Sequence, residues 1–531
     1  MKAAYIDYQD THSFSKLLLS YLDEKQDVSS FYGNKPTFEG FEKQIKTKAA
    51  FAHREVLTDT VAKQYSAMAA EDAETLRNIE LLRDENTFTV TTGHQLNIFT
   101  GPLYFVFKIV STIRLARDLK EQFPEYNFVP VYWMATEDHD FEEINHTYLF
   151  GKKINWETSA SGATGRLSTT GIEDTVHQYC AMFGLSETAE ELSYMVKDAY
   201  LNQGDLANAT RKFVHSLFGK YGLVIIDADR PELKEIFAPY VYKDIAQKIS
   251  YQQGLSSSQL LEERGYKVQV NPREINFFYL RDELRERIIE KNEVFEVLDV
   301  EDISWSLETL EKEILKHPSH FSPNVLTRPL YQEVILPNLA YIGGGAEIAY
   351  WLQLKSTFTA HHVDFPILIP RNSAMIMDAK LVSKIFRLDF TFKDIFRTAE
   401  DLHQAYVRAH TRHDLDLRDE WMEFGAVFDK IKLRAHKIDP TLGPSAEAVQ
   451  ARLKKAIKRL EKKLLKADKK NYKEALIQID RLKEKLFPKQ GLQERHENFA
   501  PYYLKYGEKL FEELLLHLNP LDFKFSILFS S

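Results

Sequence analysis

The sequence predicts an α/β protein that has a parallel sheet at its core and a long helical arm near its C-terminal end. In the first two-thirds of the chain, short apolar runs of strand length alternate with helical patterns, which is typical of a parallel sheet that helices cover on both faces. Between residues 444 and 487, apolar residues recur mostly at steps of three or four positions and no glycine interrupts them, which is typical of a long helix.

The composition is that of a globular protein and excludes several kinds of site. The 531 residues predict about two to four domains. The single cysteine excludes a disulfide framework, a cysteine-rich zinc site and an iron–sulfur cluster. The net charge of −9 argues against a dedicated nucleic-acid-binding protein. The sequence shows neither a signal-peptide pattern nor a transmembrane run, so we expect a cytoplasmic protein that binds neither membranes nor nucleic acid.

Four apolar runs are the predicted strands of the sheet. They are FTVTT at 88–92, FVPVYWM at 128–134, LVII at 223–226 and FPILI at 365–369. Polar residues follow three of them, namely Gly93-His94-Gln95, the acidic segment 137–143 and Asp227-Ala228-Asp229. Because ligands bind beyond the carboxyl ends of parallel strands, we expect the functional site at this edge. The irregular pattern at 240–340 predicts an inserted subdomain.

The arm is strongly basic. Residues 444–487 hold 14 Lys or Arg against 6 Asp or Glu, a net of +8, so the rest of the chain carries −17. A second apolar stripe runs from Trp421 to Ala435, and Asp439-Pro440 breaks the chain between the two. We therefore expect an antiparallel helical hairpin whose second helix, 444–487, is about 65 Å long. Its lysines are interpreted as the solvated face of a coiled coil, as a polyanion-binding surface, or as the border of a nucleotide site.

The first candidate site is TGHQLNIFTGP at 92–102, which leads from a predicted strand through two glycines into a helix. Glycines let the backbone approach a ligand closely, and a helix N-terminus presents free N–H groups to an anion. Lys108 lies two turns into that helix, within reach of a phosphate or carboxylate. The alternatives are an ordinary strand-to-helix turn and a solvated lysine.

The second candidate site is WMATEDHDFEEINH at 133–146, where five acids and two histidines follow an apolar strand. Three roles are open: the acids bind a divalent metal with a nucleotide, His139 acts as a general acid–base, or Asp138 and Asp140 hold a substrate amine. The alternative is a helix N-terminus, where acids complement the helix dipole.

The third candidate site is LAYIGGGAEIAYW at 339–351. Its consecutive glycines form a flexible cradle for an anion, and Arg328 upstream is suited to clamp a carboxylate or phosphate. The alternative is a tight turn. Cys180 lies in an apolar stretch, HQYCAMF, and is expected to be an inert core residue.

Four segments carry a resemblance to a known family. They are TTGHQLNIFTGPLY, FVPVYWMATEDHDFEEINH, LAYIGGGAEIAYW and GLQERHENFAPYYLKYG, and with SFSKLLLSYL and GYKVQVNPREINFFYL they cover nearly the whole chain. WMATEDHDFEEINH is the most specific of them. This set of segments resembles the bacillithiol biosynthesis cysteine-adding enzymes.

The resemblance implies a Rossmann-like core with inserted connecting subdomains and a C-terminal coiled coil that mediates homodimerisation. We expect a first part of the core at 1–239, an inserted connecting subdomain at 240–340 and a second part of the core at 341–400. The coiled coil follows at 401–490, and 491–531 is expected to pack on the core. The implied activity is a ligase that adds L-cysteine to the amine of glucosaminyl-malate, the last step of bacillithiol synthesis. Because the family resembles class I aminoacyl-tRNA synthetases, ATP or another nucleotide is the implied cofactor, with Mg²⁺ as an additional candidate.

Carried over position by position, the resemblance implies one pocket. Its substrate-binding residues are Thr92, Gly93, Gln95, Asp140, Asn145 and Arg328, and its nucleotide-binding residues are Gly343, Gly344, Gly345 and Lys108. The implied catalytic residues are Glu137, Asp138 and His139, and no metal ligand is assigned. In the working hypothesis, Glu137 and Asp138 hold the amines of cysteine and glucosamine, and His139 takes the proton of the attacking amine.

Two other classes of function compete with this one. The first is a nucleotide-binding coiled-coil adaptor without catalysis, which predicts nucleotide binding without turnover. The second is an RNA-directed nucleotidyltransferase or ligase that uses the basic helix, which predicts tight and strongly salt-dependent RNA binding.

Overall fold

The computed structural model describes residues 1–48, 50–68, 72–281, 283–411 and 415–530. At its centre lies a five-stranded parallel sheet with the spatial order β13-β12-β2-β3-β6. The strands are β2 (Thr87–His94), β3 (Asn127–Met134), β6 (Val224–Asp227), β12 (Asn338–Gly343) and β13 (Ile367–Pro370). The chain starts in the middle of the sheet, adds two strands on one side and then two on the other. This is the doubly wound order, which confirms the predicted α/β class and has its switch point between β2 and β12.

All four predicted strands are present. The fifth strand, β12, was not predicted, because its segment was interpreted only as a glycine turn. The core strands are buried almost throughout, because helices cover both faces of the sheet. Helix α5 (Tyr104–Gln122) follows β2 and packs on β2 and β3. The polar residues inside the sheet are paired: the hydroxyls of Thr89 and Thr91 donate to Asn338 Oδ1 at 3.0 and 2.8 Å.

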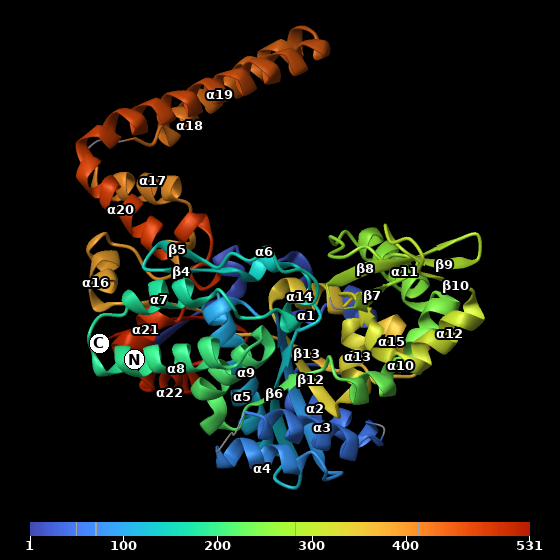
Figure 1. Cartoon of the computed structure of the whole chain (residues 1–531). Coiled ribbons are helices and arrows are strands. Elements are labelled where there is room, and N and C mark those ends of the chain that lie inside the picture. The colour runs from blue at the N-terminus through green and yellow to red at the C-terminus, as the bar shows by residue number, and fades with distance from the viewer. Residues whose placement is uncertain (49, 69–71, 282, 412–414, 531) are drawn as a thin grey trace.

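Two insertions lie near the carboxyl ends of the core strands. Between β3 and β6 the chain forms α6 (Phe141–Ile144), the hairpin of β4 (His146–Leu149) and β5 (Lys152–Asn155), and helices α7 (Glu173–Ala181), α8 (Glu187–Asn202) and α9 (Leu206–Phe218). Between β6 and β12 it forms helices α10 (Pro231–Gln247), α11 (Ile249–Glu263), α12 (Leu307–Lys316) and α13 (Arg328–Ile335) around an antiparallel sheet. In Figure 1 most of the first insertion lies toward the left and the second insertion lies toward the right.

The antiparallel sheet of the second insertion has the order β10-β9-β8-β7-β11. Its strands are β7 (Phe277–Arg281), β8 (Leu284–Lys291), β9 (Val294–Val297), β10 (Ser304–Trp305) and β11 (Phe321–Pro323). Side chains of this inserted sheet, including those of Phe278 and Arg285, reach the site at the switch point.

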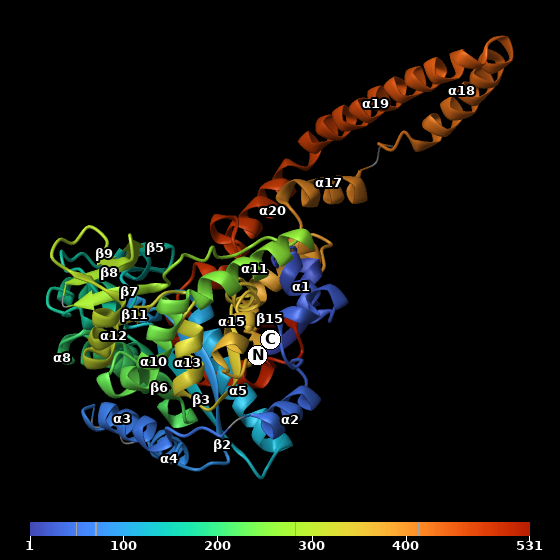
Figure 2. The same cartoon turned by 90° about the vertical axis from the view of Figure 1, so that its right-hand side faces the viewer.

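A third sheet joins the two ends of the chain. Strand β15 (Lys524–Phe529) pairs antiparallel with β1 (Lys2–Asp7) and parallel with β14 (Ser373–Met377). The N- and C-termini therefore lie side by side (Figure 2). Helices α21 (Ala500–Tyr506) and α22 (Lys509–His517) pack on the core just before β15.

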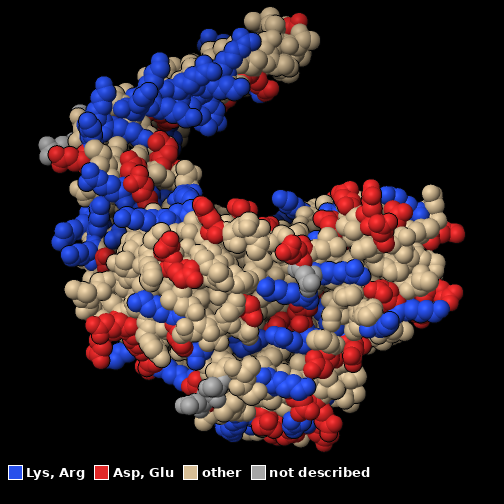
Figure 3. Space-filling view, in the orientation of Figure 1, with Lys and Arg blue, Asp and Glu red and all other residues tan. Residues whose placement is uncertain are grey.

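The arm is the predicted antiparallel hairpin, with α18 (Arg418–Ile438) running out and α19 (Gly443–Asp468) running back. It projects from the body (Figures 1 and 2), and Lys and Arg cover much of the surface of α19 (Figure 3). No residue of α18 is buried, and large apolar side chains along the hairpin are exposed, including Met422 (59%) and Leu433 (63%).

The expectation of one continuous helix from 444 to 487 was wrong. A 3₁₀ turn at Lys469–Tyr472 separates α19 from α20 (Lys473–Leu486). Tyr472 has non-helical dihedrals, φ −113° and ψ 19°, and its hydroxyl donates to the carbonyl of His410 at the end of α17 (Ala399–His410), at 2.6 Å. Beyond the turn, Ile479, Leu482 and Leu486 are buried against the body, so tertiary packing redirects the helix.

Candidate active site

A cavity of about 680 Å³ lies at the switch point, beyond the carboxyl ends of β2, β3 and β12. The core forms one wall, and the inserted sheet and the start of α13 form the other. The register of the core explains the convergence, because His94 pairs with Met134 and Thr92 pairs with Ile342. The turns that follow these three strands therefore meet at one place.

One side of the cavity is acidic. Gln95 Nε2 donates to Asp138 Oδ2 at 2.8 Å and to Glu143 Oε2 at 2.7 Å, so a single amide holds the two carboxylates together. Asp138 Oδ1 accepts the backbone N–H of His139 at 2.8 Å and that of Asp140 at 3.4 Å, which shapes the loop after β3. Both carboxylates line the cavity and are suited to bind a ligand ammonium group.

Glu137 faces a partner that the sequence analysis did not anticipate. Lys234 of α10 is 2% exposed, and its ammonium group donates both to the Glu137 carboxylate and, at 2.7 Å, to the carbonyl of Phe321 in β11. Burial raises the pKa of Glu137, while the Lys234 charge opposes the rise. Glu137 thus connects the core to the insertion, and its carboxylate is already paired.

His139 also has a partner from the insertion. Arg285 of β8 donates through Nη1 to His139 Nδ1 at 2.6 Å, and its guanidinium lies 4.0 Å from the centre of the Phe278 ring. The imidazole lines the cavity with its side chain 47% exposed.

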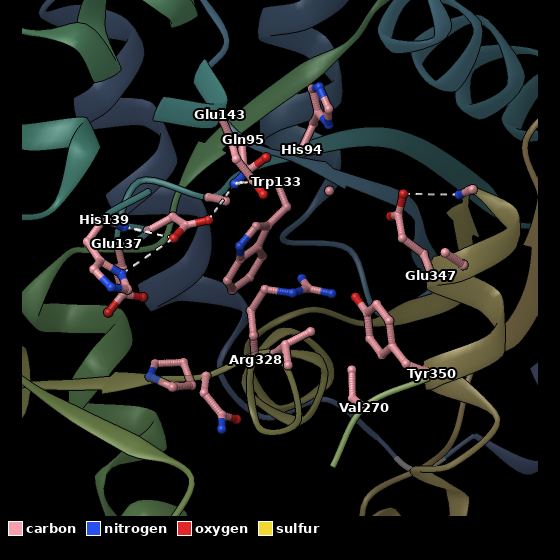
Figure 4. A pocket seen from close by; sticks show the side chains of 18 of the residues that line it. His94, Gln95, Trp133, Glu137, His139, Glu143, Val270, Arg328, Glu347 and Tyr350 are labelled. Atoms are coloured by element: carbon pink, nitrogen blue, oxygen red, sulfur yellow. Dashed lines mark hydrogen bonds and ion pairs between the residues drawn. The ribbon is translucent and has the colours of Figure 1, made fainter. Parts of the chain in front are cut away.

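The opposite side of the cavity is basic. Arg328 lies between Trp133 and Tyr350 in the middle of the cavity, with the acidic residues on one side and Glu347 on the other (Figure 4). Its Nη1 donates to Gln332 Oε1 at 3.0 Å, and the hydroxyl of Tyr350 also interacts with the guanidinium. Its Nη2 is buried and makes no hydrogen bond within 3.5 Å to a described residue. The guanidinium lies 5.5 to 5.8 Å from the centres of three aromatic rings, those of Trp133, Tyr341 and Trp351.

Arg371, just after β13, adds a second guanidinium to this side. It is 4% exposed, and its Nη2 donates to Glu494 Oε1 at 2.7 Å, while Nη1 donates to the carbonyl of Asn372. Its Nε is buried and, among the described residues, has no hydrogen-bond partner. The two unpaired N–H groups, one on Arg328 and one on Arg371, are donors that a ligand carboxylate can use.

The glycine turn at 343–345 does not offer a free anion cradle. The carboxylate of Glu347 accepts the N–H of Gly344 at 3.1 Å and the hydroxyl of Tyr341 at 2.8 Å, and it pairs with Lys108 Nζ at 2.6 Å. Burial raises the pKa of Glu347, but the Lys108 ammonium and these hydrogen bonds outweigh it and hold that pKa below its usual value. A phosphate at this turn would have to displace Glu347, and helix α14 (Gly345–Trp351) has only seven residues. The residues present do not fit a nucleotide phosphate in this arrangement.

The structure brings most of the predicted site residues together at the cavity. Gly93, Gln95, Lys108, Glu137, Asp138, His139, Arg328, Gly344 and Gly345 line it. Gly93 lies close to Arg328, since a Cβ atom added to this glycine would lie 3.5 Å from Arg328 Nη1. Lys108 is buried, and its Nζ also donates to the carbonyl of Gly93 at 2.7 Å, so it is not a solvated lysine.

Other predicted residues lie outside the lining. Thr92 is buried and its hydroxyl donates to the carbonyl of Ile342 at 2.7 Å. Asp140 precedes α6. Asn145 is buried, and its Oδ1 lies 3.0 Å from Nδ1 of His146. Gly343 ends β12. None of these four is among the residues that line the cavity. Cys180 also lies elsewhere, in α7, where burial raises the pKa of its thiol.

His94 lines the cavity as a neutral group. Burial lowers the pKa of its imidazole well below the usual value, and the charges of Lys108 and Arg371 lower it further. Within the described ranges, no cluster of three or more His, Cys, Asp or Glu side chains has the arrangement of a metal site. The same ranges contain no helix whose length and hydropathy would let it cross a bilayer.

Sequence reasoning did not select Lys234, Arg285, Glu347 or Arg371 as site residues. Glu347 had a local signal, because a glutamate three residues after an N-cap commonly reaches back to the backbone there, as it does to Gly344. Lys234 and Arg285 had none, because each reaches the site from a distant insertion.

Comparisons with known proteins agree with this architecture. Residues 1–372 match the model of the bacillithiol biosynthesis BshC N-terminal Rossmann-like domain, and residues 374–530 match that of the BshC C-terminal coiled-coil domain. A solved structure described as a putative arginyl-tRNA synthetase from Campylobacter jejuni is dissimilar, with a TM-score of 0.21 and 10% identity over 84% of this chain and 98% of that one.

Full-length relatives give the same result. A protein of Flavobacterium johnsoniae named "Putative cysteine ligase BshC" is 45% identical over 98% of this chain and 99% of its own. Proteins of the same name are 45% identical in Flavobacterium psychrophilum, over 98% of each chain, and 27% identical in Bacillus cereus, over 92% of this chain and 94% of that one. These matches confirm the resemblance seen in the sequence: the chain belongs to the bacillithiol biosynthesis BshC family.

Proposed function

We propose that the protein is a ligase that adds L-cysteine to the amine of glucosaminyl-malate and so forms bacillithiol. The single observation that carries the proposal is the polarity of the cavity, with unpaired guanidinium N–H groups at one end and the paired carboxylates of Asp138 and Glu143 at the other. The substrates match this polarity, because malate contributes two carboxylates and both cysteine and glucosamine carry amines. Membership of a family whose relatives are named as cysteine ligases supports the proposal.

In the proposed complex, the malate carboxylates accept hydrogen bonds from Arg328 and Arg371. The amines lie against Asp138 and Glu143, since Glu137 is already paired with Lys234. The amine nitrogen of glucosamine attacks the carboxyl carbon of cysteine, the new N–C bond forms, and a C–O bond of that carboxyl group breaks with its electron pair leaving on oxygen. The ammonium group loses one proton before the attack and a second after it, both to a base of the acidic loop, and in the net reaction these two protons and the leaving oxygen form water.

Formation of an amide from a free carboxylate needs an energy source, and we propose ATP or another nucleotide in this role, with Mg²⁺ as its companion ion. Lys108 and the glycine turn, the expected nucleotide contacts, are occupied by Glu347.

We further propose that the hairpin of α18 and α19 pairs with a second copy of the chain. Its exposed apolar side chains, which include Met422, Phe424 and Ile431, would be covered by such pairing. The homodimer and the nucleotide are independent parts of the proposal, since neither is needed to explain the polarity of the cavity.

Mass spectrometry of the purified protein incubated with glucosaminyl-malate, cysteine and ATP tests the activity. The expected result is bacillithiol together with a nucleotide product, and both are absent when glucosaminyl-malate or cysteine is omitted. Binding of ATP without turnover in the complete mixture would support the non-catalytic adaptor instead.

A further inference from the structure

Arg285, on β8 of the inserted sheet, contacts both its own sheet and the core. Its Nε donates to Ser322 Oγ at 3.2 Å and its Nη2 donates to the carbonyl of Pro323 at 3.3 Å. The stacking on Phe278 and these two bonds to β11 leave Nη1 to reach across to His139 Nδ1. Because Nε and Nη2 are bound to β11, the guanidinium contacts the imidazole through Nη1.

A guanidinium has five donors and no acceptor, and it keeps its charge throughout the physiological pH range. His139 Nδ1 must therefore accept the bond from Arg285 and cannot itself carry a hydrogen. The neutral imidazole must then carry its hydrogen on Nε2. The nearest carboxylate oxygen, Asp138 Oδ1, lies 3.7 Å from Nδ1, which is too long for a competing hydrogen bond, and it already accepts two backbone N–H groups.

The Nε2–H group has no hydrogen-bond partner among the residues that the structure describes, and the imidazole lines the cavity. We propose that Arg285 is a positioning residue that fixes the tautomer of His139, so that His139 presents an Nε2–H donor to the substrate. The role assigned to His139 rests on the proposed ligase function, whereas its tautomer does not.

This inference revises the working hypothesis in which His139 takes the proton of the attacking amine. An imidazole whose free nitrogen, Nε2, is already protonated donates a hydrogen bond, for example to the carboxyl oxygen of cysteine, on which negative charge develops. The carboxylates of Asp138 and Glu143 are then the proton acceptors of the loop. The second insertion becomes part of the catalytic centre, since it supplies the cation that sets this arrangement.

Substitutions of His139 separate a donor from a base. Glutamine places an amide N–H₂ near the position of Nε2, and it can donate a hydrogen bond but cannot take up a proton. We expect His139→Gln to keep at least about a tenth of the wild-type kcat, whereas His139→Ala falls by about 100-fold, the usual cost of losing one preorganised donor. If His139→Gln is as inactive as His139→Ala while wild-type protein is active, the inference is wrong.

Substitutions of Arg285 test whether it acts through His139. Arg285→Met keeps the length of the side chain and removes all donors, and we expect it to lower kcat by about tenfold in the wild-type background. In the His139→Gln background the same substitution should have little further effect, because glutamine has no tautomer to fix. Arg285→Lys, which keeps a cationic donor, should recover part of the loss. Equal losses in both backgrounds would contradict the inference, and thermal unfolding of each variant controls for folding.

A spectroscopic measurement tests the tautomer without relying on activity. In protein labelled with ¹⁵N-histidine, the signals missing from His139→Gln identify His139 among the 17 histidines. We expect a non-protonated Nδ1 and a protonated Nε2 in the wild-type protein, and a mixture of tautomers in Arg285→Met. A hydrogen on Nδ1 in the wild-type protein would overturn the inference. Failure of wild-type protein to form bacillithiol would instead count against the proposed function, and the spectrum would still report on Arg285.

Discussion

Replacing Glu333 by glutamine isolates the cost of one buried charge beneath the basic end of the cavity. Glu333 lies in α13 and is 5% exposed, and its Oε1 accepts from Gln332 Nε2 at 2.8 Å and from Asn338 Nδ2 at 2.7 Å. Its Oε2 is buried and lacks a hydrogen-bond partner within the described ranges. Gln332 in turn accepts the bond from Arg328, so this network positions the arginine that we place against the substrate carboxylate.

Burial raises the pKa of Glu333 from 4.5 to about 7. The folded protein therefore binds the carboxyl proton of Glu333 more tightly than the unfolded chain does. The contribution of this proton to the free energy of unfolding is complete below about pH 4.5 and is lost as the pH rises to about 7. A shift of about 2.5 units at 1.36 kcal/mol per unit corresponds to a loss of about 3 kcal/mol. Glutamine keeps a carbonyl oxygen for both accepted hydrogen bonds and does not ionise, so Glu333→Gln should not show this loss.

The assay is thermal unfolding of wild-type protein and Glu333→Gln at about pH 5 and about pH 8. Most of the stability contributed by protonated Glu333 is lost between these two pH values. At about 2 °C per kcal/mol, the Tm of the variant relative to wild type should rise by roughly 5 °C between the two conditions. Glu262→Gln, a substitution of an exposed glutamate on α11, is the matched control and should show no such rise. If the difference between Glu333→Gln and wild type is the same at both pH values, the reasoning is refuted.

Three further predictions concern the basic end and the arm. Glu494→Ala leaves the buried Arg371 guanidinium unpaired and should cost about 3–5 kcal/mol in urea unfolding, so unchanged stability would count against the importance of this pair. Arg328→Lys keeps the charge but loses the planar fork, so KM for glucosaminyl-malate should rise by about tenfold with little change in Tm, and an unchanged KM would place the malate elsewhere. Ile431→Glu puts a charge on the exposed apolar side of α18 and should prevent the proposed dimer from forming, so that light scattering finds a monomer. A dimer that persists in this variant would show that the interface lies outside the hairpin.

The parts of the fold that the sequence predicts are those that local patterns determine. FVPVYWM is apolar throughout because helices cover both faces of the sheet, and the acidic loop after it is polar because it meets the cavity. The arm helices follow from their apolar periodicity. The apolar stripe is interrupted between Ala467 and Ala475, where Tyr472 is the only apolar residue, and the 3₁₀ turn at Lys469–Tyr472 lies in this gap. The hydrogen bond from Tyr472 to His410 holds the chain at this turn.

Pairing between distant residues was beyond the reach of sequence reasoning. Nothing near Glu137 indicates that Lys234 neutralises it, and nothing near His139 indicates that Arg285 donates to it. Both partners come from the second insertion, so their positions depend on how that insertion packs against the core. The expected roles of Glu137 and His139 were therefore those of unpaired side chains, and the structure gives both of them partners.

The most direct measurement is the mass spectrum of the complete reaction mixture for wild-type protein and for Asp138→Asn. Asparagine keeps the shape of the side chain and removes the charge that we propose for holding the amine. Its single oxygen can still accept the backbone N–H groups of the loop, whereas the bond from Gln95 to the second oxygen is lost. We predict bacillithiol from wild-type protein in amounts that require cysteine, glucosaminyl-malate and ATP together, and a loss of about 100-fold in Asp138→Asn with unchanged thermal unfolding. No bacillithiol from folded wild-type protein, or equal amounts from both proteins, would contradict the proposal that this cavity joins cysteine to the sugar amine.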